Sequence, residues 1–187
     1  MKIAITGHTK GIGKSFEDHL RPRGHHIVGI SASTGDNINR TAHTTKLVIP
    51  CDLFINNAQS GYAQTELLYS VWQAWKGQHK WIWVISTQMT TDPVDSTPDG
   101  QDDITMSRYR NQKISLEAAA TQLSHKGSWP KISIIRPGAV ATQSNFDPSE
   151  KSDVDEWTKA IIDAFTLNPK MQIREISLGH TTKGIPL

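Results

Sequence analysis

Residues 2–13 read KIAITGHTKGIG, and this stretch carries the most specific signal for the fold. It opens as an apolar run of strand length and then turns through glycines into a segment of helical period. Glycines in such a turn let the backbone approach a pyrophosphate, while the helix that follows presents free N–H groups and the positive end of its dipole. The stretch therefore predicts a phosphate-binding turn, with a tight turn that binds nothing as the alternative. The predicted binding residues are Gly7, Thr9, Lys10, Gly11, Ile12 and Gly13.

A second interpretation of the same turn is a P-loop, because Gly13-Lys14-Ser15 resembles the end of the pattern G-x-x-x-x-G-K-[ST]. That pattern needs a glycine at position 8, where the chain has His8. No later strand ends in the acidic residue that would hold Mg²⁺. A nucleotide hydrolase therefore stays a minor alternative.

The rest of the chain alternates apolar runs with amphipathic stretches. The runs of strand length lie at 27–30, 53–55, 81–85, 132–135 and 173–178. The stretches of helical period lie at 12–20, 64–76, 105–125 and 153–165. Strands that are apolar throughout, alternating with such helices, are typical of a parallel sheet covered on both faces. We predict a doubly wound α/β fold of three layers, formed by a single domain over residues 1–187.

Two segments interrupt the alternation. Residues 33–46 are polar and too short for a full helix-plus-strand unit. Residues 88–104 are rich in Pro, Gly and Asp, which predicts a surface loop. The six tryptophans fall mostly on strands and apolar helix faces, so we prefer core or subunit-interface packing to an aromatic pocket.

Composition argues against several classes of function. The chain carries 20 Lys and Arg against 18 Asp and Glu without a basic cluster, so nucleic-acid binding is not expected. No apolar run approaches the ~20 residues that span a bilayer, and no signal peptide is recognisable, so no membrane partner is expected. Cys51 is the single cysteine, which excludes an internal disulfide and predicts a cytoplasmic location. The eight histidines lack the spacing of ligands, so no metal site is predicted.

Five motifs, in order along residues 6–142, resemble those of the short-chain dehydrogenase/reductase family. They are TGHTKGIG at 6–13, NNA at 56–58, IST at 85–87, Y-x-x-x-K at 109–113 and PGAVAT at 137–142. The resemblance implies a Rossmann-type fold and an enzyme that moves a hydride between a nicotinamide dinucleotide and a small-molecule carbonyl or alcohol. It also implies a homo-oligomer, a dimer or tetramer, paired through the helices at 64–76 and 105–125.

Tyr109 and Lys113 carry the expected chemistry. They are four residues apart on a predicted helix, so their side chains share one face. A free phenol has a pKa of about 10, and an adjacent ammonium lowers it, which lets Tyr109 act as general acid towards a carbonyl or as base towards an alcohol. By resemblance, Lys113 also binds the nicotinamide ribose, and a hydroxyl steadies the substrate oxygen. The family's strand-end pattern aligns with Thr87, and a shift of one residue selects Ser86 instead.

The end of the second strand predicts the choice of cofactor. An acidic residue there would accept a ribose 2′-hydroxyl and repel a 2′-phosphate, but the chain offers Ser31 and Ser33 and has no acid before Asp36. Hydroxyls and the Lys10 ammonium suit a phosphate, so NADP(H) is favoured over NAD(H). The resemblance adds further residues at the adenine, the adenosine ribose and the carboxamide. They are Asn37, Ile38, Asn57, Ala58, Pro137, Gly138, Val140 and Thr142.

The chain also departs from the family pattern. Gln59 replaces the glycine of N-N-A-G, and no residue matches the family's catalytic asparagine, although Gln64 or Tyr62 is expected near its position. Residues 88–104 and 143–152 either lie over the substrate pocket or are passive surface loops. A dinucleotide-binding sensor or scaffold without turnover is therefore the alternative function.

Overall fold

A six-stranded parallel sheet forms the centre of the protein. The structure, a computed structural model, describes residues 1–91, 103–142, 151–168 and 170–179. The strands lie in the order β2-β1-β3-β4-β5-β8, and every neighbouring pair is parallel. Their bounds are Lys2–Thr6 for β1, His26–Ile30 for β2, Leu53–Asn56 for β3, Trp81–Ile85 for β4, Lys131–Pro137 for β5 and Glu175–Leu178 for β8. The predicted doubly wound fold is confirmed.

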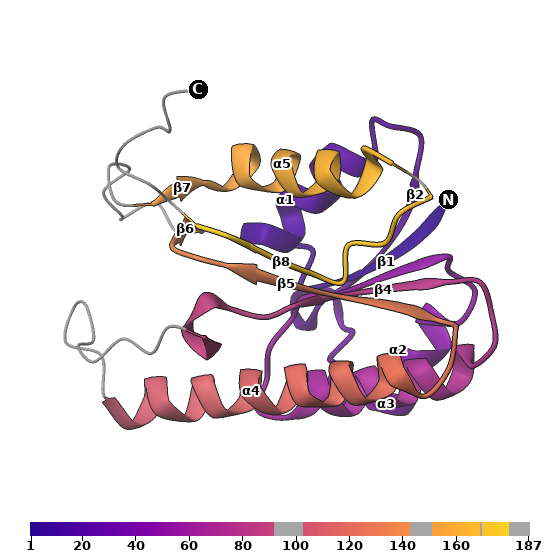
Figure 1. Cartoon of the computed structure of the whole chain (residues 1–187), viewed down its shortest axis with the longest axis horizontal. Helices are drawn as coiled ribbons and strands as arrows, with labels where there is room; N and C mark the ends of the chain where they lie inside the picture. The colour runs from indigo at the N-terminus through magenta and orange to yellow at the C-terminus, as the bar shows by residue number, and fades with distance from the viewer. Residues whose placement is uncertain (92–102, 143–150, 169, 180–187) are drawn as a thin grey trace.

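Five α-helices cover the two faces of the sheet (Figure 1). One face carries α1, Gly11–Leu20, and α5, Val154–Thr166. The other face carries α2, Thr41–Val48, α3, Ala63–Trp75, and α4, Asp103–His125. Short elements complete the described chain: η1 at Ala32–Thr34, η2 at Gln88–Thr90, and a two-stranded pair of β6, Val140–Ala141, with β7, Ser152–Asp153.

Each face of the sheet has its own hydrophobic core. The core under α1 and α5 contains Phe16, Trp83 and Trp157, and the rings of Phe16 and Trp83 lie 6.0 Å apart. The core under α2, α3 and α4 is built on buried residues such as Phe54 and Trp75. Because both faces are covered, the central strands β1, β3 and β4 consist mostly of apolar residues, which explains the continuous runs in the sequence.

The segment between β2 and β3 is shortened, as its polar sequence predicted. Residues 31–52 are all described, and they form η1 and α2 without a strand of their own. A dinucleotide-binding sheet commonly has the order 3-2-1-4-5-6, with another strand outside the second. Here β2 is the edge strand. Helix α2 was not expected, because its buried face is made largely of Thr44 and Thr45 rather than of apolar residues.

Two of the segments singled out in the sequence lie partly outside the described residues. Of the predicted loop at 88–104, residues 92–102 lie outside the described residues, and so do 143–150 of the segment 143–152. The described remainder forms η2, the start of α4 and β7. Among the described residues, no helix is both long enough and apolar enough to cross a bilayer.

Candidate functional site

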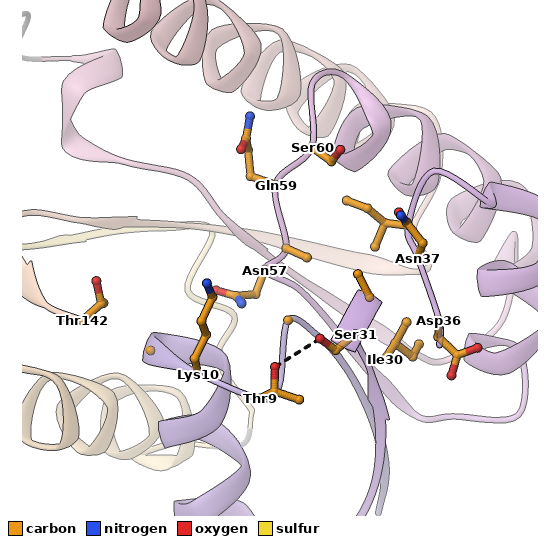
Figure 2. A pocket seen from close by; sticks show the side chains of 15 residues that line it. Thr9, Lys10, Ile30, Ser31, Asp36, Asn37, Asn57, Gln59, Ser60 and Thr142 are labelled. Carbon is orange, nitrogen blue, oxygen red and sulfur yellow. Dashed lines mark hydrogen bonds between the residues drawn. The ribbon is translucent and has the colours of Figure 1, made fainter. Parts of the chain in front are cut away.

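A cleft opens at the carboxyl ends of β1 and β3. The chain leaves β1 through α1 on one face and reaches β3 through α2 on the other, so this point is a topological switch of the kind where α/β sheets bind ligands. The cleft has a volume of about 500 Å³. Figure 2 shows its lining, which includes ten of the predicted cofactor residues. They are Gly7, Thr9, Lys10, Gly11, Ser31, Asn37, Ile38, Asn57, Ala58 and Thr142.

The glycine turn packs closely against the end of β3. Gly7 has a φ of +71°, and a Cβ on Gly13 would lie 2.3 Å from the carbonyl oxygen of Gly7. Thr6, which is fully buried, accepts hydrogen bonds at its Oγ1 from the backbone N–H groups of Asn57, at 2.9 Å, and Ala58, at 3.0 Å. These contacts hold the two loops that line the cleft in one arrangement.

The helix that follows the turn presents free donors to the cleft. Helix α1 begins after Lys10, and no side chain caps its first turn. Its first backbone N–H groups are therefore available to a ligand, and the helix dipole favours an anion there. Figure 2 shows the Lys10 side chain extending between Asn57 and Thr142.

Three hydroxyls meet where β2 ends. Thr9 Oγ1 lies 3.1 Å from Ser31 Oγ and from Ser33 Oγ, and the two serine oxygens lie 2.9 Å apart. Asp36 also lines the cleft, but its carboxylate lies 2.9 Å from Nε2 of His43. The corner therefore offers hydroxyl donors, with the nearby carboxylate already paired.

Several predicted cofactor residues lie away from the cleft lining. Ile12 and Val140 are partly buried and pack against the core under α1 and α5. Gly13 belongs to the tight packing of the turn, and Pro137 and Gly138 lie where β5 ends beside β8. Residues in the lining that were not predicted to bind are Ile30, Ala32, Asp36, Gln59 and Ser60. The sequence signal that could have identified these five residues is proximity, because each lies within two residues of a residue that was predicted to bind the cofactor.

A second group of predicted residues meets on α4 and after β4. Thr87 lies close enough to the Tyr109 hydroxyl to act on it as a hydrogen-bonding side chain, and Lys113 Nζ lies 5.6 Å from the centre of the Tyr109 ring. Ser86, by contrast, is buried and donates its hydroxyl to the Glu117 carboxylate. Of the two candidate hydroxyls, Thr87 is therefore the one beside Tyr109.

Gln64 holds Lys113 in place. Lys113 is only 3% exposed, and its Nζ donates to Gln64 Oε1 and to the carbonyl oxygen of Ile85, each at 2.9 Å. Gln64 Nε2 in turn donates to the carbonyl oxygen of Asn56 at 2.7 Å. Tyr62 is 54% exposed. Gln64 is thus the residue in contact with the lysine, and it links the ends of β3 and β4 to α4.

The electrostatics differ from the expectation that an ammonium lowers the tyrosine pKa. Burial raises the pKa of Tyr109, and the hydrogen bond with Thr87 acts in the opposite direction. Burial also lowers the pKa of Lys113 to about 7, against the attraction of the Glu117 carboxylate. The physical reason is desolvation, since Gln64 and a carbonyl oxygen hold the Lys113 amine inside the protein.

Glu117 ties the surroundings of this group together. It lies one helical turn beyond Lys113 and accepts hydrogen bonds from Thr90 Oγ1, at 2.8 Å, and from the guanidinium of Arg136, at 2.7 to 3.1 Å. Arg136 also pairs with Glu175 at 2.8 Å. The network thus joins α4 to η2, β5 and β8.

The cleft and the tyrosine group are joined by one further contact. Gln59 lines the cleft and donates its side-chain amide to Gln112, the neighbour of Lys113 on α4. Both groups therefore belong to one carboxyl edge of the sheet. The described residues contain no cluster of three or more His, Cys, Asp or Glu side chains that could hold a metal ion.

Comparison with known proteins shows the fold. No protein-family model matches the chain, and no curated protein matches it in sequence. An alcohol dehydrogenase from the archaeon Thermococcus sibiricus, complexed with 5-hydroxy-NADP, is 14% identical with a TM-score of 0.74 over 100% of this chain and 99% of that one. A 3-alpha-hydroxysteroid dehydrogenase from Pseudomonas sp. B-0831, complexed with NADH, is 19% identical with a TM-score of 0.64 over 95% and 94%. A short-chain dehydrogenase from Streptomyces avermitilis is 15% identical with a TM-score of 0.69 over 95% and 88%. The chain has the fold of these dehydrogenases.

Proposed function

We propose that the chain is an NADP(H)-dependent oxidoreductase that reduces a carbonyl group, or oxidises an alcohol, of a small molecule. The observation that carries the proposal is the meeting of Tyr109, Thr87 and Lys113 at the same sheet edge as a cleft with free helix N–H groups. The fold adds support, because similar solved structures include dehydrogenases complexed with NADP, NADPH or NADH.

The cleft residues fit a dinucleotide. The glycine turn and the uncapped start of α1 suit its phosphates, and the loop at Asn57 and Ala58 suits its adenosine half. The bound nicotinamide supplies or accepts the hydride. The chain's own residues orient the substrate and move the proton.

Each residue of the tyrosine group then has a role. In reduction, the Tyr109 hydroxyl donates its proton to the carbonyl oxygen, and the Thr87 hydroxyl donates a hydrogen bond to the same oxygen. Lys113 lies against the Tyr109 ring and stabilises the phenolate that is left. Gln64 fixes the lysine amine at this position.

The phosphorylated cofactor is favoured by the corner at the end of β2. Thr9, Ser31 and Ser33 offer hydroxyls within 3.1 Å of one another, and Lys10, next to Thr9 in the chain, supplies a positive charge to the same cleft. Asp36 is the group that would favour the unphosphorylated cofactor, but its carboxylate lies beside His43. This corner therefore offers several hydrogen-bond donors to a 2′-phosphate, whereas the carboxylate that could accept from a 2′-hydroxyl is already paired.

The catalytic assignment is tested with a panel of carbonyl compounds and NADPH. Tyr109→Phe removes the proton donor, so we expect turnover to fall about 10³-fold while NADPH still stabilises the variant against heat. Tyr69→Phe changes an exposed tyrosine of α3 and is the matched control. Equal turnover in wild type and Tyr109→Phe would contradict the assignment. Stabilisation by NADPH without turnover on any carbonyl would favour the sensor alternative. That alternative is relevant because Lys113 already donates a hydrogen bond to Gln64.

The cofactor preference is tested separately by thermal stabilisation with NADPH and NADH. We expect the larger shift with NADPH. Lys10→Gln should weaken NADPH binding about 10-fold and leave NADH binding unchanged, because it removes one charge-assisted contact to phosphate. Lys14→Gln is the control, since Lys14 pairs with Asp18 on the exposed side of α1. A larger shift with NADH would overturn the preference.

Assembly is the remaining part of the proposal. We expect a homo-oligomer paired through α3 and α4, whose exposed side chains include the apolar Ile114 of α4. Light scattering coupled to gel filtration measures the mass directly. A single species of 20.8 kDa at micromolar concentration would contradict it.

A further inference from the structure

A second cavity lies at the opposite edge of the sheet from the cofactor cleft. Its volume is about 320 Å³. Ile3, Leu53 and Trp81 line it from the amino-terminal ends of β1, β3 and β4. On the α1 and α5 side of the sheet in Figure 1, Leu20 at the end of α1 and Phe165 near the end of α5 close it. The cavity is thus separate from every residue assigned above to cofactor or catalysis.

The walls of this cavity are apolar and aromatic. Trp83 and Phe165 both line it, and their ring centres lie 4.4 Å apart. The uncharged polar side chains in the wall each donate to a backbone carbonyl oxygen: Ser133 Oγ to that of Ile173 at 2.6 Å, Thr166 Oγ1 to that of Ile162 at 2.9 Å, and Gln172 Nε2 to that of Ile132 at 2.9 Å. The tryptophans that were predicted to fill the core therefore also enclose a space, and that space suits an apolar body.

Positive charge stands at one side of the cavity. Arg23 and His25, from the turn between α1 and β2, are the ionisable side chains in its described lining, and no carboxylate is among them. Burial lowers the pKa of His25, with the N-terminal amine and Arg23 acting in the same direction, so the positive charge comes from Arg23. A guanidinium carries five N–H donors. The Asp163 carboxylate accepts one hydrogen bond from Arg23 Nη2 at 3.2 Å, which leaves other N–H groups of the guanidinium for a ligand. The charge and the planar fork match a carboxylate.

We propose that this cavity binds a small monocarboxylate with an aromatic or medium-chain aliphatic body, the carboxylate at Arg23 and the body between Trp81 and Phe165. The size agrees, because small-molecule pockets commonly measure about 300 to 1,000 Å³ and have apolar walls with a few polar groups that orient the ligand. The inference is independent of the proposed function. Whether the cleft binds NADP(H) does not affect the proposed binding of a monocarboxylate.

Octanoate is the probe for the test, with octan-1-ol as its uncharged counterpart, titrated into the full chain by calorimetry. We expect octanoate to bind at least about 10-fold more tightly than octan-1-ol, because only octanoate can pair with the guanidinium. Arg23→Gln should weaken octanoate binding about 10-fold and leave octan-1-ol unchanged. Arg21→Gln is the matched control, since Arg21 pairs with Glu17 and does not line the cavity. Saturating NADPH should not displace octanoate.

A second variant tests the space itself. Thr166 lines the cavity yet is exposed at the end of α5, so Thr166→Trp can fill the space without disturbing the core. We expect this variant to lose octanoate binding while its free energy of unfolding in urea changes no more than for an ordinary surface substitution. Three results would each overturn the proposal: equal affinity for octanoate and octan-1-ol, octanoate binding unaffected by both Arg23→Gln and Thr166→Trp, or displacement of octanoate by NADPH.

Discussion

The interior of the protein is packed differently at the two ends of the strands: the carboxyl edge of the sheet, at the cofactor cleft, and the amino edge, at the second cavity. At the carboxyl edge, buried polar groups such as Thr6, Gln64 and Lys113 are held by hydrogen bonds, and glycines allow backbone contacts that a Cβ would prevent. At the amino edge, aromatic side chains leave a space of about 320 Å³. The proposed chemistry therefore depends on polar groups whose hydrogen bonds are satisfied, while the volume at the opposite edge can change without harm to that chemistry.

The sharpest test of this difference adds one methyl group at each edge. Gly13→Ala puts a Cβ 2.3 Å from the Gly7 carbonyl oxygen, so the turn must shift. We expect the free energy of unfolding to fall by about 3 kcal/mol and the stabilisation by NADPH to disappear. Urea unfolding with and without NADPH measures both effects.

The control for this test is Gly127→Ala, in the segment that leads into β5. A Cβ there would meet nothing closer than the Trp129 carbonyl oxygen at 3.8 Å. We expect a change within about 0.5 kcal/mol, as for an ordinary surface position. Equal losses at Gly13 and Gly127 would show that the carboxyl edge is no more tightly packed than the amino edge.

The next contrast is between two ion pairs. Glu117 and Arg136 have side chains only 13% and 11% exposed, and Glu117→Gln leaves the Arg136 guanidinium with Glu175 alone. We expect a loss of about 2 kcal/mol in the free energy of unfolding, because the partner charge stays largely buried. Turnover should fall as well, since Thr90 and Ser86 on either side of Thr87 lose an acceptor carboxylate.

The matched change at the amino edge is Asp163→Asn, which removes the partner of Arg23 on the exposed surface. No measurable shift of the urea midpoint is expected there, because exposed ion pairs contribute little. A larger loss from Asp163→Asn than from Glu117→Gln would reverse the contrast.

The buried lysine makes the carboxyl edge sensitive to pH. Burial lowers the pKa of Lys113 to about 7. Above that pH the folded protein loses the proton while the unfolded chain keeps it up to about pH 10, so the unfolded state binds more protons and stability rises with pH. We expect the wild type to gain up to about 1.4 kcal/mol per pH unit between pH 7 and 9 relative to Lys113→Met.

Urea unfolding of both proteins at pH 7, 8 and 9 measures this gain. Lys46→Met, at an exposed position of α2, is the control and should follow the wild type at every pH. Parallel curves for wild type and Lys113→Met would mean that the lysine titrates alike in the folded and unfolded states.

Much of the fold could be predicted because its signals are local. The runs that become β1, β3 and β4 hold three to five consecutive apolar residues, and the glycine turn is contiguous in the chain. Helix α2 could not be predicted in this way, since Thr44 and Thr45 are buried against neighbours that include Ser70 of α3, which only the tertiary structure brings near.

The candidate site also combines features that are local in the sequence with features that depend on tertiary packing. The spacing of Tyr109 and Lys113 is visible in the sequence, but the contact between Lys113 and Gln64 joins two helices and depends on the packing of α3 beside α4. Desolvation depends on that packing too, which is why the pKa of Tyr109 is raised where an adjacent ammonium was expected to lower it. Likewise Trp81 and Trp83 follow a buried-strand pattern that says nothing about a space beside them.

The smallest expected effect comes from a substitution that fills part of the cavity at the amino edge. Ile173 is half-buried in the cavity wall, and Ile173→Phe adds volume where the surrounding side chains leave room. We expect a gain of about 0.5 to 1 kcal/mol in the free energy of unfolding, as for other cavity-filling changes, together with weaker octanoate binding. Ala32→Leu makes a comparable enlargement in the cofactor cleft and should weaken NADPH binding without stabilising the fold. If Ile173→Phe destabilised the protein, the amino edge would be as closely packed as the carboxyl edge, and the contrast between them would fail.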